Sequence, residues 1–338
     1  MVALIGFAMI IAIVFLLLKG KMSPIVVLTL IPAIAALLLG FSPIEIAGFI
    51  KDGIKTTTSN GILFIFSVIY FGVMSDTGMF DVIVQKLVKL AGNNVIAVTV
   101  ATAVIATIAH LDGTTATTVL ITIPALYPVY KKMNIDTRIL LCLTGACMGV
   151  MNLLPWGGPT MRSATVLGID PNELWRQLLP MQVVGVVIAL ATAVFWGFVE
   201  KKRGAGSENA PQGVVKSEEY DELEEAAGDA TNSELARPKL FAFNLILTLI
   251  VIVCLVFVKV PSYYIFMVGC VIALLVNYPG AKLQNKIIKS HSGPALMMAS
   301  TILAAGVFLG VLEETEIMNS PDRKLILEDG SEYIGYHF

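Results

Sequence analysis

The chain has 338 residues, of which 56% are hydrophobic and only 14% are charged. A soluble domain is about half apolar and about a quarter charged, so the main solvent of this chain is lipid. Its 23 basic and 25 acidic residues give a net charge of −2 and gather in a few loops and two polar stretches, which excludes a nucleic-acid-binding surface. No Walker motif, nucleotide fingerprint or catalytic triad is visible, so the sequence predicts neither ATP-driven transport nor an enzyme.

Apolar runs long enough to cross a bilayer follow one another along most of the chain. A spanning helix needs about 20 mostly apolar residues, because the bilayer core is about 30 Å thick and each helical residue rises about 1.5 Å. We therefore predict an all-α polytopic membrane protein. Its eight predicted spans lie near residues 2–18, 24–40, 61–75, 138–154, 178–199, 241–258, 263–278 and 295–312.

The apolar run 95–130 differs from the others. It is too long for one span, and residues 110–115, His-Leu-Asp-Gly-Thr-Thr, interrupt it at its centre. We interpret it as a re-entrant hairpin whose two half-length helices meet at a polar tip. If the hairpin enters and leaves on one side, one set of basic loop residues falls on the cytoplasmic side, where short loops carry an excess of Lys and Arg. The set is Lys19, Lys21, Lys86, Lys89, Lys131, Lys132, Arg138, Lys201, Lys202, Arg203, Arg237, Lys282, Lys286 and Lys289. The predicted topology has its N-terminus outside.

Two distant segments of the chain share one pattern. Residues 71–77, Phe-Gly-Val-Met-Ser-Asp-Thr, align with residues 309–315, Leu-Gly-Val-Leu-Glu-Glu-Thr, at an offset of 310 − 72 = 238 residues. The same offset maps the first two predicted spans onto apolar runs of the second half. Because an odd number of crossings, five, separates the copies, we predict an inverted repeat of the kind found in secondary transporters.

From this repeat we predict that the chain is divided into four parts. They are a first transmembrane repeat over 1–199 that includes the hairpin 95–130, a polar cytoplasmic linker over 200–240, a partial inverted second repeat over 241–312 and a polar non-membrane tail over 313–338. A complete second copy would end near 199 + 238 = 437, so the sequence predicts a second half truncated at its C-terminus.

The hairpin tip is the first candidate binding region. Transporters of this design bind substrate near the bilayer midplane, where broken helices expose backbone groups. Burying the charged Asp112 side chain in a membrane costs free energy, so a specific role is expected for it. The alternatives are that it ligates a cation, carries a proton or caps the second helix. His110 is either a proton relay or a histidine hydrogen-bonded at a helix end, and the threonines either contact substrate or bond back to the preceding turn. The substrate-binding candidates are Asp112, Gly113, Thr114, Thr115, Thr117 and Thr118.

The second candidate region is the interruption at 152–162, Asn-Leu-Leu-Pro-Trp-Gly-Gly-Pro-Thr-Met-Arg. Two prolines and two glycines cannot continue a helix, although the same residues also suit an interfacial turn with an aromatic anchor. Arg162 either pairs with a substrate carboxylate or snorkels to the interface. Asp76, after the third span, is a proton-coupling candidate beside Asp112 and His110, and is otherwise a solvated cap. The substrate-binding candidates here are Asn152, Gly157, Gly158, Thr160 and Arg162.

At these two breaks the sequence resembles the CitMHS family of citrate-metal:proton symporters, part of the ion transporter superfamily. The resemblance rests on residues 70–81, on Leu111-Asp112-Gly113 with Ala116-Thr117-Thr118, and on residues 148–162. It covers roughly residues 1–312. The chain departs from the family pattern at Thr114-Thr115, where a second glycine is expected, and in lacking a second hairpin and a second broken helix.

The resemblance implies a secondary active transporter of the bacterial cytoplasmic (inner) membrane. Its substrate would be citrate, or a related di- or tricarboxylate, complexed with Mg²⁺ or Ca²⁺ and carried together with protons, and it would hold no permanent cofactor. The bilayer is an implied partner, and a homo-oligomer is compatible with the family. Two alternatives stay open: a Na⁺-coupled carboxylate or inorganic-anion carrier of the same superfamily, and a truncated fragment that does not transport.

Overall fold

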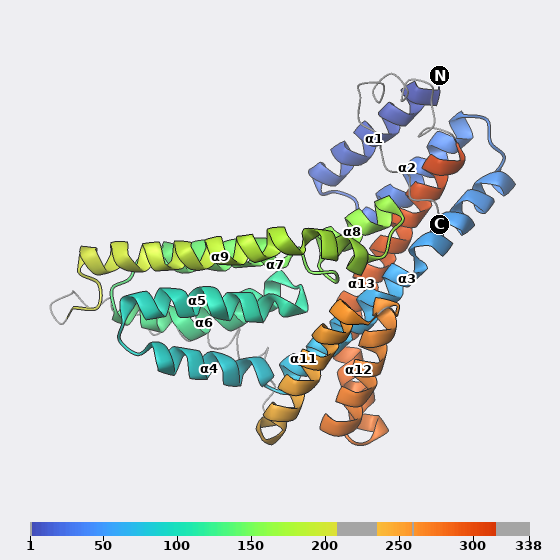
Figure 1. Cartoon of the computed structure of the whole chain (residues 1–338). Coiled ribbons are helices and arrows are strands. Elements are labelled where there is room, and N and C mark those ends of the chain that lie inside the picture. The colour runs from blue at the N-terminus through green and yellow to red at the C-terminus, as the bar shows by residue number, and fades with distance from the viewer. Residues whose placement is uncertain (1, 208–234, 259, 316–338) are drawn as a thin grey trace. The chain divides into compact units, whose positions relative to one another are not determined.

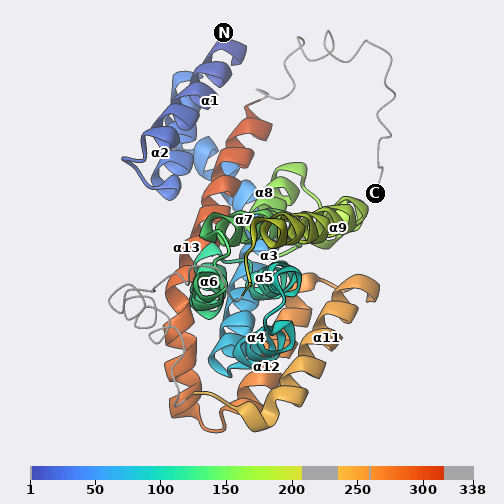
Figure 2. The ribbon, with the colours of Figure 1, turned by 90° about the vertical axis from the view of Figure 1, so that its left-hand side faces the viewer.

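The computed structural model describes residues 2–207, 235–258 and 260–315, and all regular structure in these ranges is helical (Figures 1 and 2). The predicted all-α membrane class is confirmed. The helices are α1 (Val2–Lys19), α2 (Pro24–Leu38), α3 (Pro43–Asp76), α4 (Met79–Ala91), α5 (Val95–Ala109), the 3-10 helix η1 (His110–Asp112), α6 (Thr115–Lys132), α7 (Thr137–Met151), α8 (Gly158–Leu167), α9 (Pro171–Arg203), the 3-10 helix η2 (Pro238–Leu240), α11 (Phe241–Phe257), α12 (Ser262–Asn277) and α13 (Ala281–Glu314).

Among the described residues, 6 helical segments are long and apolar enough to cross a membrane. They are α1, α3, α5 with η1, α9, η2 with α11, and α13. The apolar helices α2, α7 and α12 are shorter. Each of the eight predicted spans coincides with one of these helices, but α3, α9 and α13 run to 34, 33 and 34 residues. Polar residues extend them, and a search for apolar length does not detect such turns.

The start of α3 shows how a polar extension is stabilised. The Ser42 hydroxyl donates to the Glu45 carboxylate at 2.7 Å, and the Ser42 backbone N–H donates to the same oxygen at 2.8 Å. The Glu45 backbone N–H in turn donates to the Ser42 hydroxyl. This is a capping box, which satisfies amides at a helix start that have no partner inside the helix. The helix therefore begins well before the apolar run at 61–75.

The helices keep the offset seen in the sequence. Adding 238 to the bounds of α3 gives 43 + 238 = 281 and 76 + 238 = 314, which are the bounds of α13. The same shift carries α2, 24–38, onto 262–276, and α12 spans Ser262–Asn277. It also carries α1, 2–19, onto 240–257, and α11 spans Phe241–Phe257. Three helices of each half thus recur in the same order with matching ends, while the inverted relation between the halves stays a prediction.

The described residues form two compact units, the first from 2–61 with 297–315 and the second from the described part of 62–296. In the first unit, α1 and α2 share a core with the end of α13 through Met9, Val27 and Leu312. Here α3 approaches α13 very closely, because a Cβ added to Gly53 would lie 2.0 Å from the carbonyl oxygen of Gly306. Small residues allow such contact between helix backbones in lipid.

The second unit contains α4 to α9, α11 and α12. Helices α5, α6, α7 and α9 lie side by side in Figure 1, and with α4 they enclose one apolar core. A Cβ added to Gly197 of α9 would lie 2.5 Å from the Thr99 hydroxyl of α5, so glycine permits this packing. The hydroxyls of Thr102 and Tyr130 join α5 to α6 at 2.8 Å inside the core.

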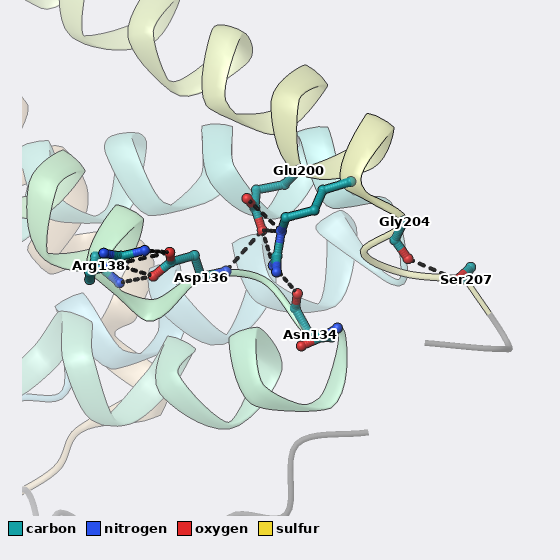
Figure 3. A network of polar contacts seen from close by, with 7 residues as sticks. Asn134, Asp136, Arg138, Glu200, Gly204 and Ser207 are labelled. Carbon is teal, nitrogen blue, oxygen red and sulfur yellow. Dashed lines mark hydrogen bonds and ion pairs between the residues drawn. The ribbon is translucent and has the colours of Figure 1, made fainter. Parts of the chain in front are cut away.

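Polar contacts hold the far end of α9 to the loop between α6 and α7 (Figure 3). Glu200 is only 3% exposed and accepts hydrogen bonds from the Asp136 backbone N–H at 2.9 Å and from Arg203 at 2.5 Å. Arg203 also donates to the carbonyl oxygen of Asn134 at 2.6 Å. A buried carboxylate needs such partners, because an unpaired buried charge is strongly destabilising. Most of the predicted linker, 208–234, and of the predicted tail, 316–338, lies outside the described residues.

Candidate functional site

The predicted hairpin tip is a sharp turn between α5 and α6. The chain passes through η1, then Gly113 in the left-handed region with φ of 72°, then Thr114 in an extended conformation that begins α6. The Asp112 carboxylate accepts hydrogen bonds from the Thr114 backbone N–H at 2.8 Å and from its hydroxyl at 2.6 Å. Asp112 therefore closes the turn as an Asx turn, whereas the N-cap residue of α6 is Thr114 and not Asp112.

The two arms of this turn lie close to the predicted bounds of 95–130. The arm formed by α5 and η1 has 18 residues, and α6 has 18, the same length as α1. Each helix takes about half of the apolar run, and the interruption is confined to the few residues between them, as the sequence predicts. The re-entrant path itself stays a prediction.

The second predicted break interrupts the chain between α7 and α8. Asn152 ends α7, and Gly157 precedes α8. A Cβ added to Gly157 would lie 2.5 Å from the Asn152 carbonyl oxygen, so only glycine fits there. The same carbonyl accepts a hydrogen bond from the Thr160 hydroxyl at 3.2 Å, which fastens the first turn of α8 to the end of α7.

The two breaks meet in the structure. The indole N–H of Trp156 donates to the Leu111 carbonyl oxygen at 2.6 Å. His110 Nε2 lies 3.3 Å from Asn152 Oδ1, and a Cβ on Gly113 would lie 3.5 Å from the Trp156 carbonyl oxygen. Residues that the sequence placed in two separate regions therefore form one site.

The hydrogen bonds of His110 depend on its protonation state. The Thr118 hydroxyl donates to the Thr114 carbonyl at 2.9 Å, so it accepts a hydrogen from His110 Nδ1, 2.6 Å away. The other ring nitrogen then faces Asn152. When Nε2 carries a proton, it donates to the Asn152 side-chain oxygen. When Nε2 carries none, it can only accept a hydrogen bond, which requires the Asn152 amide to rotate by 180° so that its NH₂ group faces the ring. The Asn152 amide orientation is thus tied to one proton on His110, whose side chain is fully buried.

Aromatic residues from α3 and α12 position the break. Trp156 stacks on Phe71, with ring centroids 5.3 Å apart, and meets the edge of Phe266 at 5.1 Å. Tyr70 contacts Phe266 and places its hydroxyl 3.1 Å from that of Thr248 on α11. Sequence reasoning missed Phe266 and Thr248, because both lie inside apolar runs where nothing distinguishes them from ordinary span residues.

The other predicted site residues are distributed more widely. Gly158 is the first residue of α8, and Arg162 is exposed on the same helix. Thr115 is exposed at the tip, whereas the Thr117 hydroxyl lies 2.7 Å from that of Thr114. Asp76 is not at the tip.

Asp76 pairs with a histidine that the sequence did not suggest. Asp76 Oδ2 lies 2.8 Å from Nε2 of His291, and the Asp76 side chain is only 12% exposed. The interpretation of Asp76 as a solvated cap is therefore wrong. His291 follows a lysine-rich stretch at the polar start of α13, and no local pattern marks it as a partner of Asp76.

A helical, multi-pass membrane protein in which two helix breaks meet has the architecture of a secondary transporter. The chain belongs to the CitMHS family, described as citrate transporters, whose family model matches residues 2–320. The resemblance seen in the sequence is confirmed.

Three proteins of Bacillus subtilis (strain 168) are similar to this chain. The Mg²⁺/citrate complex secondary transporter is 37% identical over 319 residues, which cover 94% of this chain and 72% of that protein. A citrate transporter is 32% identical over 326 residues, covering 96% and 73%. An uncharacterised transporter is 32% identical over 328 residues, covering 96% and 74%.

Proposed function

We propose that this chain carries citrate, complexed with a divalent cation such as Mg²⁺ or Ca²⁺, across the bacterial cytoplasmic membrane in symport with protons. Membership of a citrate transporter family supports the substrate, and the relative named for the Mg²⁺/citrate complex supports the metal. The observation that carries the proposal is the meeting of the hairpin tip and the helix break, joined through Trp156 and Leu111.

The chemistry of this meeting point suits a metal-citrate complex. Helices α6 and α8 both begin there, and the amides at a helix start, together with the helix dipole, favour carboxylate groups. The Thr115 and Thr117 hydroxyls add donors and acceptors at the tip. The metal already offsets much of the negative charge of citrate, so a dense cluster of basic residues is not required. Arg162, exposed on α8, is assigned to a carboxylate that remains uncoordinated.

Proton coupling is assigned to the candidates Asp112, His110 and Asp76. The contact between His110 and Asn152 supports a link between proton and substrate at the tip. When His110 is doubly protonated, Asn152 directs its side-chain oxygen at the ring and its NH₂ group away from the ring. When His110 loses that proton, the Asn152 amide rotates so that the NH₂ group faces the ring. If His110 is the candidate that takes up the proton, the proton changes the donor that Asn152 offers to a citrate carboxylate.

We also propose the inverted repeat and a topology with the N-terminus outside. The matching ends of α2 with α12 and of α3 with α13 support the repeat. The basic residues of the loops support the orientation. Alternating access would then arise from movement of one repeat against the other.

The test is uptake of labelled citrate by proteoliposomes that contain the purified chain. Uptake should require Mg²⁺ or Ca²⁺, rise when the outside is more acidic than the lumen, and collapse with a protonophore. Liposomes without protein and a chelator of divalent cations are the controls. Uptake driven by Na⁺ and insensitive to the protonophore would replace symport with protons by Na⁺ coupling, and absence of uptake would contradict the proposed function.

A further inference from the structure

Asp76 and His291 form a second contact between titratable groups, apart from the hairpin tip. The two residues are 215 positions apart in the sequence, on α3 and α13, and their facing atoms are 2.8 Å apart. Their side chains are 12% and 21% exposed. The pair is thus shielded but not fully buried, whereas the His110 side chain is fully buried.

Gly72 makes this contact sterically possible. A Cβ added to Gly72 would lie 2.5 Å from both Cγ and Nδ1 of His291. Gly72 is four residues before Asp76, so both positions lie on the same face of α3. The imidazole therefore lies flat along α3, over the glycine, with Nε2 directed at the carboxylate. Any other residue at position 72 would push the ring away from Asp76.

The surroundings of the pair are polar and mixed in charge. Tyr278, fully buried at the end of α12, lies within electrostatic range of both the Asp76 carboxylate and the Arg237 guanidinium. Arg237 covers the Tyr278 ring at 4.9 Å, and its backbone N–H donates to the carbonyl of Thr77 at 2.9 Å. Further charged residues on α4 and on the first part of α13 are Asp81, Lys86, Lys89, Lys282, Lys286 and Lys289.

We propose that the transported proton binds at this pair, on His291 Nε2 opposite the Asp76 carboxylate. A proton site of this kind presupposes the symport proposed above and specifies where its proton is carried. Binding forms one N–H bond and turns a carboxylate facing a neutral ring into an ion pair of zero net charge. Release breaks that bond and leaves one net negative charge. The neutral, paired state is the less costly one to hold in low-dielectric surroundings.

Adjacent residues of α3 connect this proton site to the substrate site. Phe71 stacks on Trp156 of the helix break, and Gly72 is in contact with His291. A displacement of α3 at one contact therefore moves the other. This arrangement provides a mechanical link between the loaded proton site and the position of Trp156.

The experiment compares two processes in proteoliposomes that contain the full chain. One is accumulation of labelled Mg-citrate driven by an imposed pH gradient, and the other is exchange of labelled for unlabelled Mg-citrate without a gradient. The variants are His291→Gln and the nearly isosteric Asp76→Asn. Ser292→Ala is the matched control, because that exposed hydroxyl donates only to the Lys289 carbonyl in its own helix. We expect both pair variants to lose gradient-driven accumulation while exchange persists, and the control to retain both processes.

The outcomes separate the proton site from the proposed function. Unchanged accumulation in both pair variants would show that the proton is carried elsewhere while symport stands. Loss of exchange together with accumulation in Asp76→Asn would assign the pair a structural role and overturn the inference. If His291→Gln does not reach the membrane, Asp76→Asn alone decides. No metal-dependent exchange by the unmodified chain would mean that the proposed function has failed, and the proton site with it.

Discussion

The indole N–H of Trp156 donates a hydrogen bond to the carbonyl oxygen of Leu111 at 2.6 Å. This bond joins the helix break after α7 to the turn between α5 and α6. The Leu111 carbonyl belongs to η1, where the turn leaves backbone groups without the partners of a continuous helix. A side chain of one break therefore satisfies the backbone of the other.

Trp156→Phe should weaken substrate binding without unfolding the site. Phenylalanine keeps an aromatic ring against Phe71 but cannot donate to the Leu111 carbonyl. A lost hydrogen bond of this kind costs about 1 kcal/mol, or about a fivefold rise in the KM for Mg-citrate. Trp196→Phe, on α9 outside the site, is the control and should leave KM unchanged. An unchanged KM in Trp156→Phe would show that the bond does not support binding.

Thr118→Val should destabilise the chain, because it removes the hydroxyl that bridges His110 and the Thr114 carbonyl. Both groups would then lack this buried partner, at a cost of about 1 to 3 kcal/mol. Thermal unfolding in detergent or nanodiscs would measure the loss. Thr115→Val is a matched control on the same turn, since Thr115 is exposed. Equal melting temperatures for the two variants would contradict the assigned bridge.

Gly53→Ala should disrupt the packing of α3 against α13. The added methyl group would meet backbone atoms of Gly306, which cannot move aside as a flexible side chain would. Gly48→Ala lies on the same helix with nothing within 4 Å of its added Cβ, so it should be neutral or slightly stabilising. Melting temperature and the yield of folded protein would distinguish the two. Equal melting temperatures and yields for Gly53→Ala and Gly48→Ala would contradict the close contact between α3 and α13.

The ion pair of Asp136 with Arg138 should stabilise the folded chain by an amount that decreases at acidic pH. Hydrogen bonds from Arg138 lower the pKa of Asp136 from 3.8 to about 2. Because the pKa is lower in the folded state, the ionised pair stabilises the fold above about pH 4 and loses this contribution as the pH falls toward 2. Asp136→Asn should therefore flatten the dependence of melting temperature on pH in this window. Identical slopes for the variant and the unmodified chain would refute the contribution, and Arg138→Gln should flatten the slope similarly.

Much of the fold was predictable because its signals are local. Apolar runs located the helices that became α1, α2, α11 and α12 almost to the residue. Pro and Gly located both breaks, since neither residue type sustains a helix interior. The extensions of α3 and α13 escaped prediction, because apolar length does not mark their polar turns. A capping box begins α3, and His291 of α13 contacts Asp76.

The residues of the candidate site also fall into those that local sequence signals predicted and those that only tertiary contacts revealed. His110, Asp112 and Asn152 were predicted from unusual residues in apolar surroundings, a signal that needs no knowledge of neighbours. Phe266 could not be predicted, because an aromatic residue in a membrane span is ordinary until its contact with Trp156 is known. The same holds for His291, which resembles any polar residue near a lysine-rich helix start.

The sequence by itself determined that the chain is a helical membrane protein, where its helices break, and the family to which it belongs. These properties depend on composition, on local backbone chemistry and on motifs of neighbouring residues. Only the tertiary structure decided that the two breaks meet through Trp156 and that Asp76 faces His291 across 215 positions of sequence. Such pairings depend on how helices pack, and packing is set by the shapes of many distant side chains together.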